Sequence, residues 1–376
     1  MRTAKIARIL FYILLAVAPL GTRYIGYMGN IGGVDIEAGT VSMFGTQLIA
    51  ILFIILALMV AVDKEEDVPA WKKDSFSFVA LLIVASAYVS AALSLRFTSS
   101  LVVASWIALG AAVFGSVRIV KPSTAISAIA LAVGAVLQAL LGGIQFLMQE
   151  VVASKWLGMA AHLPSEVGAF VVGTDDGRWL RAYGTLPHPN ELGMYLAVAA
   201  VLSLAYAAGR SGWAKRLGVV AAILCAFGLV LTFSRSAAIG FIAGLVTLAI
   251  PALFCVGKWK PRASGTLIIV AVGLIAFVSA FIVMRDPAMS RVSAEGRLER
   301  ISIEERSSQL VDARVLFLRN SLVGVGPGMM PYAAHEMDSG RDAWDYQYVH
   351  NAPLLVAVET GFFGIIAWTV FTWLLI

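Results

Sequence analysis

The stretch VHNAPLLVAVETGFFG, residues 349–364, sets a histidine and an asparagine directly against an apolar run. The run continues to Ile376 and is long enough to cross a bilayer as a helix, which takes about 20 residues. Two interpretations of the polar pair compete. Either His350 and Asn351 cap a membrane helix at the interface, or His350 carries out chemistry there. The answer depends on which face of which membrane the pair occupies.

The whole chain has the composition of a membrane protein. Hydrophobic residues make up 60% and charged residues 14%, and the mean hydropathy is +0.86, whereas a soluble domain is about half apolar and a quarter charged. Apolar stretches recur along nearly the whole length, without the short alternating segments of a membrane β-barrel. We therefore predict an all-α, polytopic bundle of transmembrane helices that forms one membrane domain over 1–376.

About ten spans are expected, on the length that a bilayer requires. The predicted spans are 6–20, 43–62, 76–95, 101–117, 125–148, 190–208, 217–232, 237–254, 266–284 and 352–376. The N-terminus resembles a signal peptide, but the many spans that follow favour an uncleaved first helix. Because the chain stops at FTWLLI without a polar anchor, we expect it to be truncated within a longer membrane domain.

Basic residues are distributed unequally between alternate connections, and this distribution predicts the orientation. Arginines and lysines concentrate near 2–8, 64–73, 118–121, 210–216 and 258–262, whereas the other short connections hold few. The N-terminus is therefore expected in the cytoplasm, with 149–189, the turn at 232–237 and the large loop 285–351 on the outer face. The net charge of +5 then reports topology, and no nucleic-acid partner is expected.

Two outer-face segments carry candidate binding residues. In RAYGTLPHPNELG, 181–193, a helix entrance accounts for the prolines and Asn190, but it does not account for Arg181 and His188, which we regard as candidate substrate contacts. In LTFSRSAAIG, 231–240, Arg235 sits in a tight turn. Its side chain either reaches lipid headgroups or presents a fixed guanidinium to phosphate oxygens.

The large outer loop is predicted to contain a surface helix over 304–320, too polar and too short to span. Leu310, Ala313 and Phe317 are expected to form its apolar face, with Arg306 on that face; Arg314 and Arg319 are expected to be solvated or to meet headgroups. The run GVGPG, 324–328, allows backbone to pass closely and lacks the lysine of a P-loop.

Several other kinds of site are not favoured. Asp175 and Asp176 in TDDG, 174–177, are interpreted as an Asx-type turn. The four scattered histidines predict no zinc site, and Cys225 and Cys255, in or near predicted helices, predict no structural disulfide. Inside the spans, polar exceptions such as Gln138 and Gln145 are neutral, whereas a proton- or ion-coupled transporter usually carries an ionisable group at mid-membrane.

The outer-face motifs together resemble a known family. HNAPLLVAVETGFFG fits the pattern His-Asn-x9-Gly-x-x-Gly, with Gly361 and Gly364 in register, and RSSQL, 306–310, fits Arg-x3-Leu before GVGPG. A second Arg-x3-Leu begins at Arg314, but its distance to the glycine run favours Arg306. With RAYGTLPHPNELG and TFSRSA, these blocks make residues 180–364 similar to the superfamily of O-antigen ligases and O-antigen polymerases.

The resemblance implies metal-independent glycosyl transfer from a polyprenyl-pyrophosphate-linked glycan, without a cofactor, at the periplasmic face of a bacterial inner membrane. It assigns Arg235 and Arg306, with Arg181 less firmly, to the pyrophosphate, and His350 to activation of an acceptor hydroxyl. His188, Asn190 and Asn351 are expected to support the site. The acceptor would be a lipid A core sugar for a ligase or another lipid-linked glycan for a polymerase. A transporter or flippase of lipid-linked sugar or a small anion is the alternative from another class.

The residues support this chemistry without the resemblance. A transfer on the outer face needs an activated donor that arrives in the membrane, and a lipid pyrophosphate meets that need. Two arginines can stabilise the leaving diphosphate in place of a metal through charge-assisted contacts. A neutral imidazole near pH 7 is suited to act as a general base, and in-line attack predicts inversion at the anomeric carbon.

Overall fold

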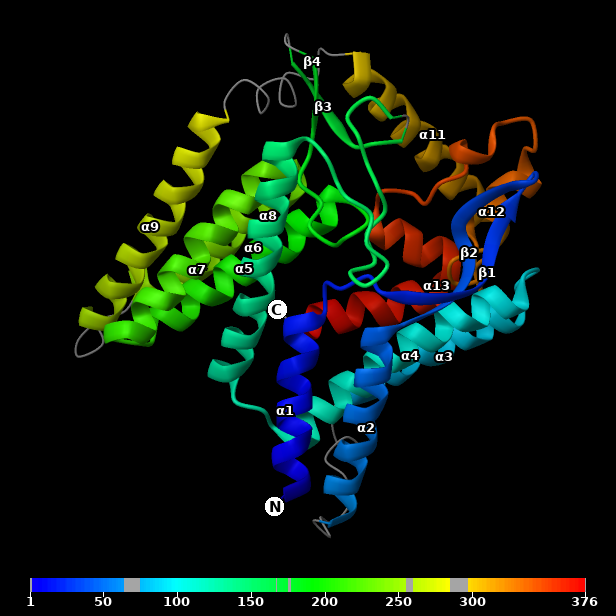
Figure 1. Cartoon of the computed structure of the whole chain (residues 1–376). Coiled ribbons are helices and arrows are strands. Elements are labelled where there is room, and N and C mark those ends of the chain that lie inside the picture. Colours follow the sequence, from blue (N-terminus) through cyan, green and yellow to red (C-terminus); the bar gives the residue numbers. More distant parts are fainter. Residues whose placement is uncertain are drawn as a thin grey trace. The chain divides into compact units, whose positions relative to one another are not determined.

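A computed structural model describes residues 2–63, 75–166, 168–174, 177–254, 260–284 and 297–375 (Figure 1). Within these ranges, nine helices are long and apolar enough to cross a membrane, which confirms a polytopic helical membrane protein. They are α2 (Gly45–Asp63), α3 (Ser75–Ala92), α4 (Phe97–Val120), α5 (Thr124–Met148), α6 (Pro189–Ala208), α7 (Gly212–Leu231), α8 (Arg235–Leu253), α9 (Lys260–Val283) and α13 (Ala352–Leu375).

The first predicted span, 6–20, is a shorter helix than the others. It is α1, Arg2–Val17, with 16 residues, slightly below the range of about 17–25 residues for a transmembrane helix. Pro19 explains the early end, because a proline disfavours the helical conformation of the residue before it. The other predicted spans match the nine long helices to within a few residues at most ends.

Two antiparallel hairpins interrupt the helices, and the sequence analysis did not predict them. Strands β1 (Arg23–Ile31) and β2 (Val34–Phe44) form one hairpin, and β3 (Val171–Thr174) and β4 (Gly177–Leu180) form the other. The first turn contains Gly32 and Gly33 at φ 60° and 86°. Glycines at positive φ between two strands are the signature of a tight hairpin turn.

The described residues form two compact units. Unit 1 comprises 1–7, 23–121 and 300–376, and unit 2 comprises 8–22 and 122–299. In unit 2, α5 to α9 pack through small residues, and Gly228 would bring an added Cβ within 2.9 Å of Ala139. Such close approach gives neighbouring membrane helices their van der Waals contact.

Unit 1 packs α13 against α3, and α13 is broken at Gly361. This glycine has φ 68° and ψ −163°, a region that essentially only glycine adopts. The next amide, of Phe362, leaves the helix pattern and donates 2.7 Å to the Ser321 carbonyl. An added Cβ at Gly361 would lie 2.3 Å from the Leu322 oxygen. The backbone at 321–323 therefore packs directly against the kink in α13.

The predicted surface helix is α11, Arg297–Arg319, followed by the short helix α12, Met330–Met337. The expected apolar face of α11 was wrong in part. Leu310 is 44% exposed, whereas Gln309, Ala313 and Leu316 are buried. Positions three and four apart share one side of a helix. The buried side is therefore rotated from the expected one, because a polar residue, Gln309, occupies a place that the sequence analysis gave to leucine.

Candidate functional site

His350 forms the centre of a polar group in unit 1. Its Nδ1 lies 2.7 Å from Oε1 of Gln309, whose side chain is 5% exposed. Because an amide oxygen only accepts hydrogen bonds, Nδ1 carries the proton and Nε2 keeps its lone pair. Gln309 therefore orients the imidazole and selects the tautomer in which Nε2 can accept a proton.

Arg306 belongs to the same group as His350. It precedes Gln309 by three residues on α11, so both side chains emerge from one side of the helix. Burial first, and the positive charge of Arg306 second, lower the pKa of His350 below its ordinary value. The imidazole is consequently neutral near pH 7, the form that a general base requires.

Asn351, next to His350, has a different role. Its Oδ1 accepts a hydrogen bond of 3.1 Å from the Leu354 amide, and its carbonyl accepts one of 2.8 Å from the Leu355 amide. These contacts cap α13, since they satisfy amides that the first turn of a helix leaves unpaired. The capping interpretation is therefore confirmed for Asn351, and catalysis by His350 stays a prediction.

The segment that leads to His350 is anchored on α11. Arg341 pairs with Asp312 at 2.7 Å and with Asp338 at 3.3 Å, and its guanidinium lies 4.9 Å from the Tyr346 ring centroid. The Tyr346 hydroxyl donates 2.6 Å to the Asp338 carbonyl. These contacts limit the freedom of 338–349 and so hold His350 opposite Gln309.

The glycine run packs against α13, with the Val325 and Gly326 amides donating to the Val358 and Glu359 carbonyls. Gly324, at φ 77°, approaches the Glu359 backbone so closely that a Cβ would lie 2.4 Å from it, as the sequence predicted for close backbone passage. The Glu359 carboxylate faces the amides of Gly328 and Met330. Its Oε1 is buried and has no hydrogen-bond partner within the described part of the chain. Sequence reasoning missed Glu359, although a lone carboxylate inside an apolar span is a recognisable signal.

In unit 2, Arg181 is held by protein acceptors. The side chain is 3% exposed; Nε donates 2.7 Å to the Thr232 carbonyl and Nη2 donates 2.6 Å to Asn190 Oδ1. It thereby links the start of α6 to the turn between α7 and α8. This geometry is that of a positioning residue for the turn.

His188 and Asn190 also build this junction. His188 is the N-cap of α6, and its Nδ1 accepts 2.9 Å from the Asn190 amide. Its ring centroid lies 3.9 Å from that of Phe170. The helix begins at Pro189, one residue before the predicted span of 190–208, and the function of His188 as its cap was not anticipated, because histidine is an uncommon N-cap.

The loop from 181 to 188 rests on two buried glutamines of α5. Gln138 exchanges hydrogen bonds with Thr185, its Oε1 accepting 2.8 Å from the amide. Gln145 donates 2.8 Å to the Gly184 carbonyl and accepts from the amides of Tyr183 and Gly184. The neutral polar residues noticed inside the spans therefore satisfy loop backbone that would otherwise be buried without partners.

Arg235 is the first residue of α8. Phe233, at φ 47°, makes the preceding turn, and the Ser234 hydroxyl caps the helix by accepting 3.4 Å from the Ala237 amide. Gly193 of α6 packs against this turn, with Ser234 3.0 Å from where its Cβ would be. Arg235 thus stands at the N-terminal, positive end of a helix dipole, where phosphates bind readily.

Apolar cavities flank the start of α8 inside unit 2. One of about 330 Å³ is lined by Arg235 at one end and by residues of α7, α8 and α9, including Ile242, Phe277 and Phe281. Another of about 520 Å³ lies between α6 and α8, with Asn190 and Ser236 at its polar end and Gly240 along its wall. Each has a mainly apolar lining that includes a few polar side chains.

Some sequence interpretations fall partly or wholly outside the described residues. Asp175, Asp176 and Cys255 lie outside them, whereas Cys225 is a buried free thiol. In the described ranges, no three histidine, cysteine, aspartate or glutamate side chains are grouped in a way that would hold a metal ion. His350, Gln309 and Arg306 lie in unit 1, and Arg235 lies in unit 2.

Among comparisons with known proteins, one family model matches part of the chain. Residues 220–369 match the family model described as O-antigen ligase. The match includes Arg235, Arg306 and His350, and it leaves Arg181 outside. No curated protein and no solved structure matches the chain.

Proposed function

We propose that the chain, whose residues 220–369 match the O-antigen ligase family model, is a member of the superfamily of O-antigen ligases and polymerases and transfers a glycan from a polyprenyl-pyrophosphate carrier to an acceptor hydroxyl. Members of this family are membrane glycosyltransferases. We assign the reaction of a ligase, in which the acceptor is a lipid A core sugar. The reaction takes place at the periplasmic face of a bacterial inner membrane, with the N-terminus in the cytoplasm.

The observation that carries the proposal is the His350 group. With Nδ1 bonded to Gln309, Nε2 is the atom that takes the proton of the acceptor hydroxyl. The hydroxyl oxygen attacks the anomeric carbon, the bond from that carbon to the pyrophosphate oxygen breaks, and the diphosphate leaves with the electron pair. Attack opposite the leaving group inverts the anomeric configuration. A general base contributes about 100- to 10,000-fold to such a step.

The arginines act on the leaving group. Arg306 and Arg235 donate charge-assisted hydrogen bonds to the diphosphate, and the first amides of α8 add to the positive potential around Arg235. No divalent metal is required in this scheme. Arg181 acts through Arg235, because its bonds to Thr232 and Asn190 hold the turn from which α8 starts.

The cavities beside α8 fit the lipid part of the donor. A polyprenyl chain is a hydrocarbon, and the walls formed by Ile242, Phe277 and Phe281 are apolar. With the chain in such a cavity, its diphosphate would lie at the helix end that carries Arg235. This supports a lipid-linked donor over a soluble nucleotide sugar.

The test is transfer by the purified chain in detergent, with a polyprenyl-pyrophosphate glycan as donor and EDTA present. Lipid A core and a second lipid-linked glycan serve as separate acceptors, so that a ligase and a polymerase give different products. We expect transfer to lipid A core, reduced about 100- to 10,000-fold in His350→Ala.

Ser307→Ala on the exposed side of α11 is the matched control and should keep full activity. Transfer that continues normally in His350→Ala would contradict the catalytic assignment. Complete absence of transfer, with movement of the intact donor across vesicles instead, would favour a flippase.

A further inference from the structure

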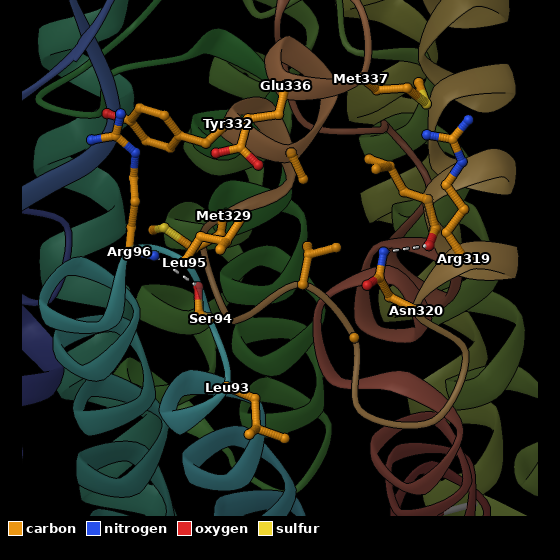
Figure 2. A pocket seen from close by; sticks show the side chains of 14 residues that line it. Leu93, Ser94, Leu95, Arg96, Arg319, Asn320, Met329, Tyr332, Glu336 and Met337 are labelled. Carbon is orange, nitrogen blue, oxygen red and sulfur yellow. Dashed lines mark hydrogen bonds between the residues drawn. The ribbon is translucent and has the colours of Figure 1, made fainter.

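A second polar cavity lies in unit 1, at the end of α11 away from Arg306. Its volume is about 330 Å³, near the lower limit of about 300 Å³ for small-molecule sites. Its walls come from the turn between α3 and α4, the end of α11, and α12. Figure 2 shows Arg96, Tyr332 and Glu336 on one side of it and Arg319 with Asn320 on the other.

Arg96 is fixed in orientation. Its guanidinium carbon lies 3.8 Å from the Tyr332 ring centroid, close enough for a cation–π contact. Tyr332 is itself held by the first hairpin, since its hydroxyl donates 3.0 Å to the Ala38 carbonyl and accepts 3.0 Å from the Asn30 amide. Stacking occupies the face of the guanidinium, so that its N–H edge stays available for hydrogen bonds.

Arg319, expected from the sequence to meet solvent or headgroups, lines the same cavity. Within the part of the chain that the structure describes, neither Arg96 nor Arg319 forms an ion pair. The wall also carries acceptors: the Glu336 carboxylate, and Oδ1 of Asn320, whose amide nitrogen donates 3.1 Å to the Leu316 carbonyl. The cavity therefore offers two cationic donors, one anionic acceptor and one neutral acceptor.

We propose that this cavity binds one acidic sugar of the glycan, a residue that carries a carboxylate or phosphate. The anionic substituent would accept hydrogen bonds from Arg96 and Arg319, and the ring hydroxyls would donate to Glu336 and Asn320. A plain phosphate would leave the Glu336 carboxylate without a donor and would be repelled by it. The match of both donors and acceptors therefore favours a sugar.

The position of the cavity agrees with a glycan. Gln309, at the His350 group, and Arg319 are ten residues apart on one helix, which corresponds to about 15 Å at about 1.5 Å per residue. An oligosaccharide of several sugars spans such a distance along α11. The inference rests on the proposed function for its ligand, since it assigns a second contact to the same glycan, remote from the transferred bond.

The test is direct binding, so that it does not depend on transfer. Purified protein is titrated calorimetrically with tetragalacturonate as the probe, with maltotetraose as the uncharged comparison. We expect the acidic tetramer to bind more tightly, and Arg319→Gln to weaken it about 10- to 100-fold, as for the loss of a hydrogen bond to a charged group. Arg319→Lys should retain part of the affinity because it keeps the charge.

Two matched variants separate the cavity from the rest of the molecule. Arg314→Gln, on the exposed side of the same helix, should bind tetragalacturonate normally. His350→Ala should also bind normally, so a failure of the proposed transfer reaction would not be mistaken for a failure of this site.

Three results would overturn the inference. The first is maltotetraose binding as tightly as tetragalacturonate, and the second is an unchanged affinity for tetragalacturonate in Arg319→Gln when thermal melting shows that variant to be folded. The third is loss of tetragalacturonate binding in nanodiscs that contain phosphatidylethanolamine, together with retention in nanodiscs of phosphatidylcholine. That result would assign the cavity to a lipid headgroup.

Discussion

At the scale of single residues, His350 and Asn351 are neighbours with separate roles, one oriented by Gln309 and the other capping α13. The sequence marked both residues, but it grouped Arg306 with Leu310, which is exposed, and not with the buried Gln309. It did not indicate Gln309, because the partner of His350 lies 41 positions earlier in the chain. Arg181 and His188 were singled out for substrate; their contacts make them parts of a helix junction, and contact with substrate stays a prediction.

The pH dependence of transfer should reflect the environment of His350. Its pKa is lowered by burial and then by Arg306, and only the neutral imidazole acts as the base. The midpoint of the acid limb of the transfer rate should therefore lie below about 6.5, the ordinary value for histidine. The rate of transfer against pH is the measurement.

Arg306→Gln supplies the control for that profile. Removing the positive charge takes away one cause of the lowered pKa, so the midpoint of the acid limb should move to higher pH, whatever the residual rate. A midpoint that stays in place in Arg306→Gln, or a wild-type midpoint well above 6.5, would show that another group controls the profile.

At the scale of elements, hydropathy predicted the spans well because membrane crossing depends on the length of a local apolar run. The hairpin β1–β2 was missed although Gly32-Gly33 between β-branched and aromatic residues is a turn signal. The side of α11 that is buried was misjudged, because it depends on what the helix packs against. The break at Gly361 likewise depends on the chain at 321–323, which only the fold brings to α13.

Gly361 should not tolerate a side chain. Gly361→Ala would place its Cβ against the Leu322 carbonyl and force a residue other than glycine into a conformation that costs about 1–3 kcal/mol. Gly115→Ala, at a helical position where an added Cβ meets nothing within 4 Å, should be neutral or slightly stabilising. Thermal unfolding in detergent compares the two; equal melting temperatures would disprove the kink's requirement for glycine.

Gln145 should be essential to the loop that positions Arg181. Gln145→Leu fills the same space but leaves three backbone groups of Tyr183 and Gly184 without their partner. Each buried unpaired group costs about 1–3 kcal/mol. The melting temperature should fall clearly, whereas Gln347→Leu at an exposed position should change it little. No difference between the two variants would mean that water replaces the glutamine.

At the scale of the whole molecule, the groups assigned to the reaction come from two units, Arg306 and His350 from unit 1 and Arg235 from unit 2. The sequence alone could assign these three residues to one site only because each was predicted on the same outer face of the membrane. The order of the motifs along the chain supplied the resemblance to a family, which a family model matches over residues 220–369. The contacts that orient each side chain came from residues far away in sequence, which no local pattern reveals.

The orientation can be tested by labelling. In a Cys255→Ser background, with Cys225 buried, Ser339→Cys should react with a membrane-impermeant maleimide in intact spheroplasts. Ser211→Cys, in a connection predicted to be cytoplasmic, should react only after the membrane is opened. The reverse pattern would place His350 in the cytoplasm and contradict a periplasmic transfer.

The most direct test of the account is the affinity of the purified chain for a polyprenyl pyrophosphate without a glycan. Arg235→Gln and Arg306→Gln should each weaken binding about 10- to 100-fold, since each removes a hydrogen bond between charged groups, whereas His350→Ala and Arg314→Gln should leave it unchanged. Loss of affinity in only one of the two arginine variants would contradict a diphosphate held by both arginines. An equal loss in His350→Ala would contradict a base that acts separately from the diphosphate.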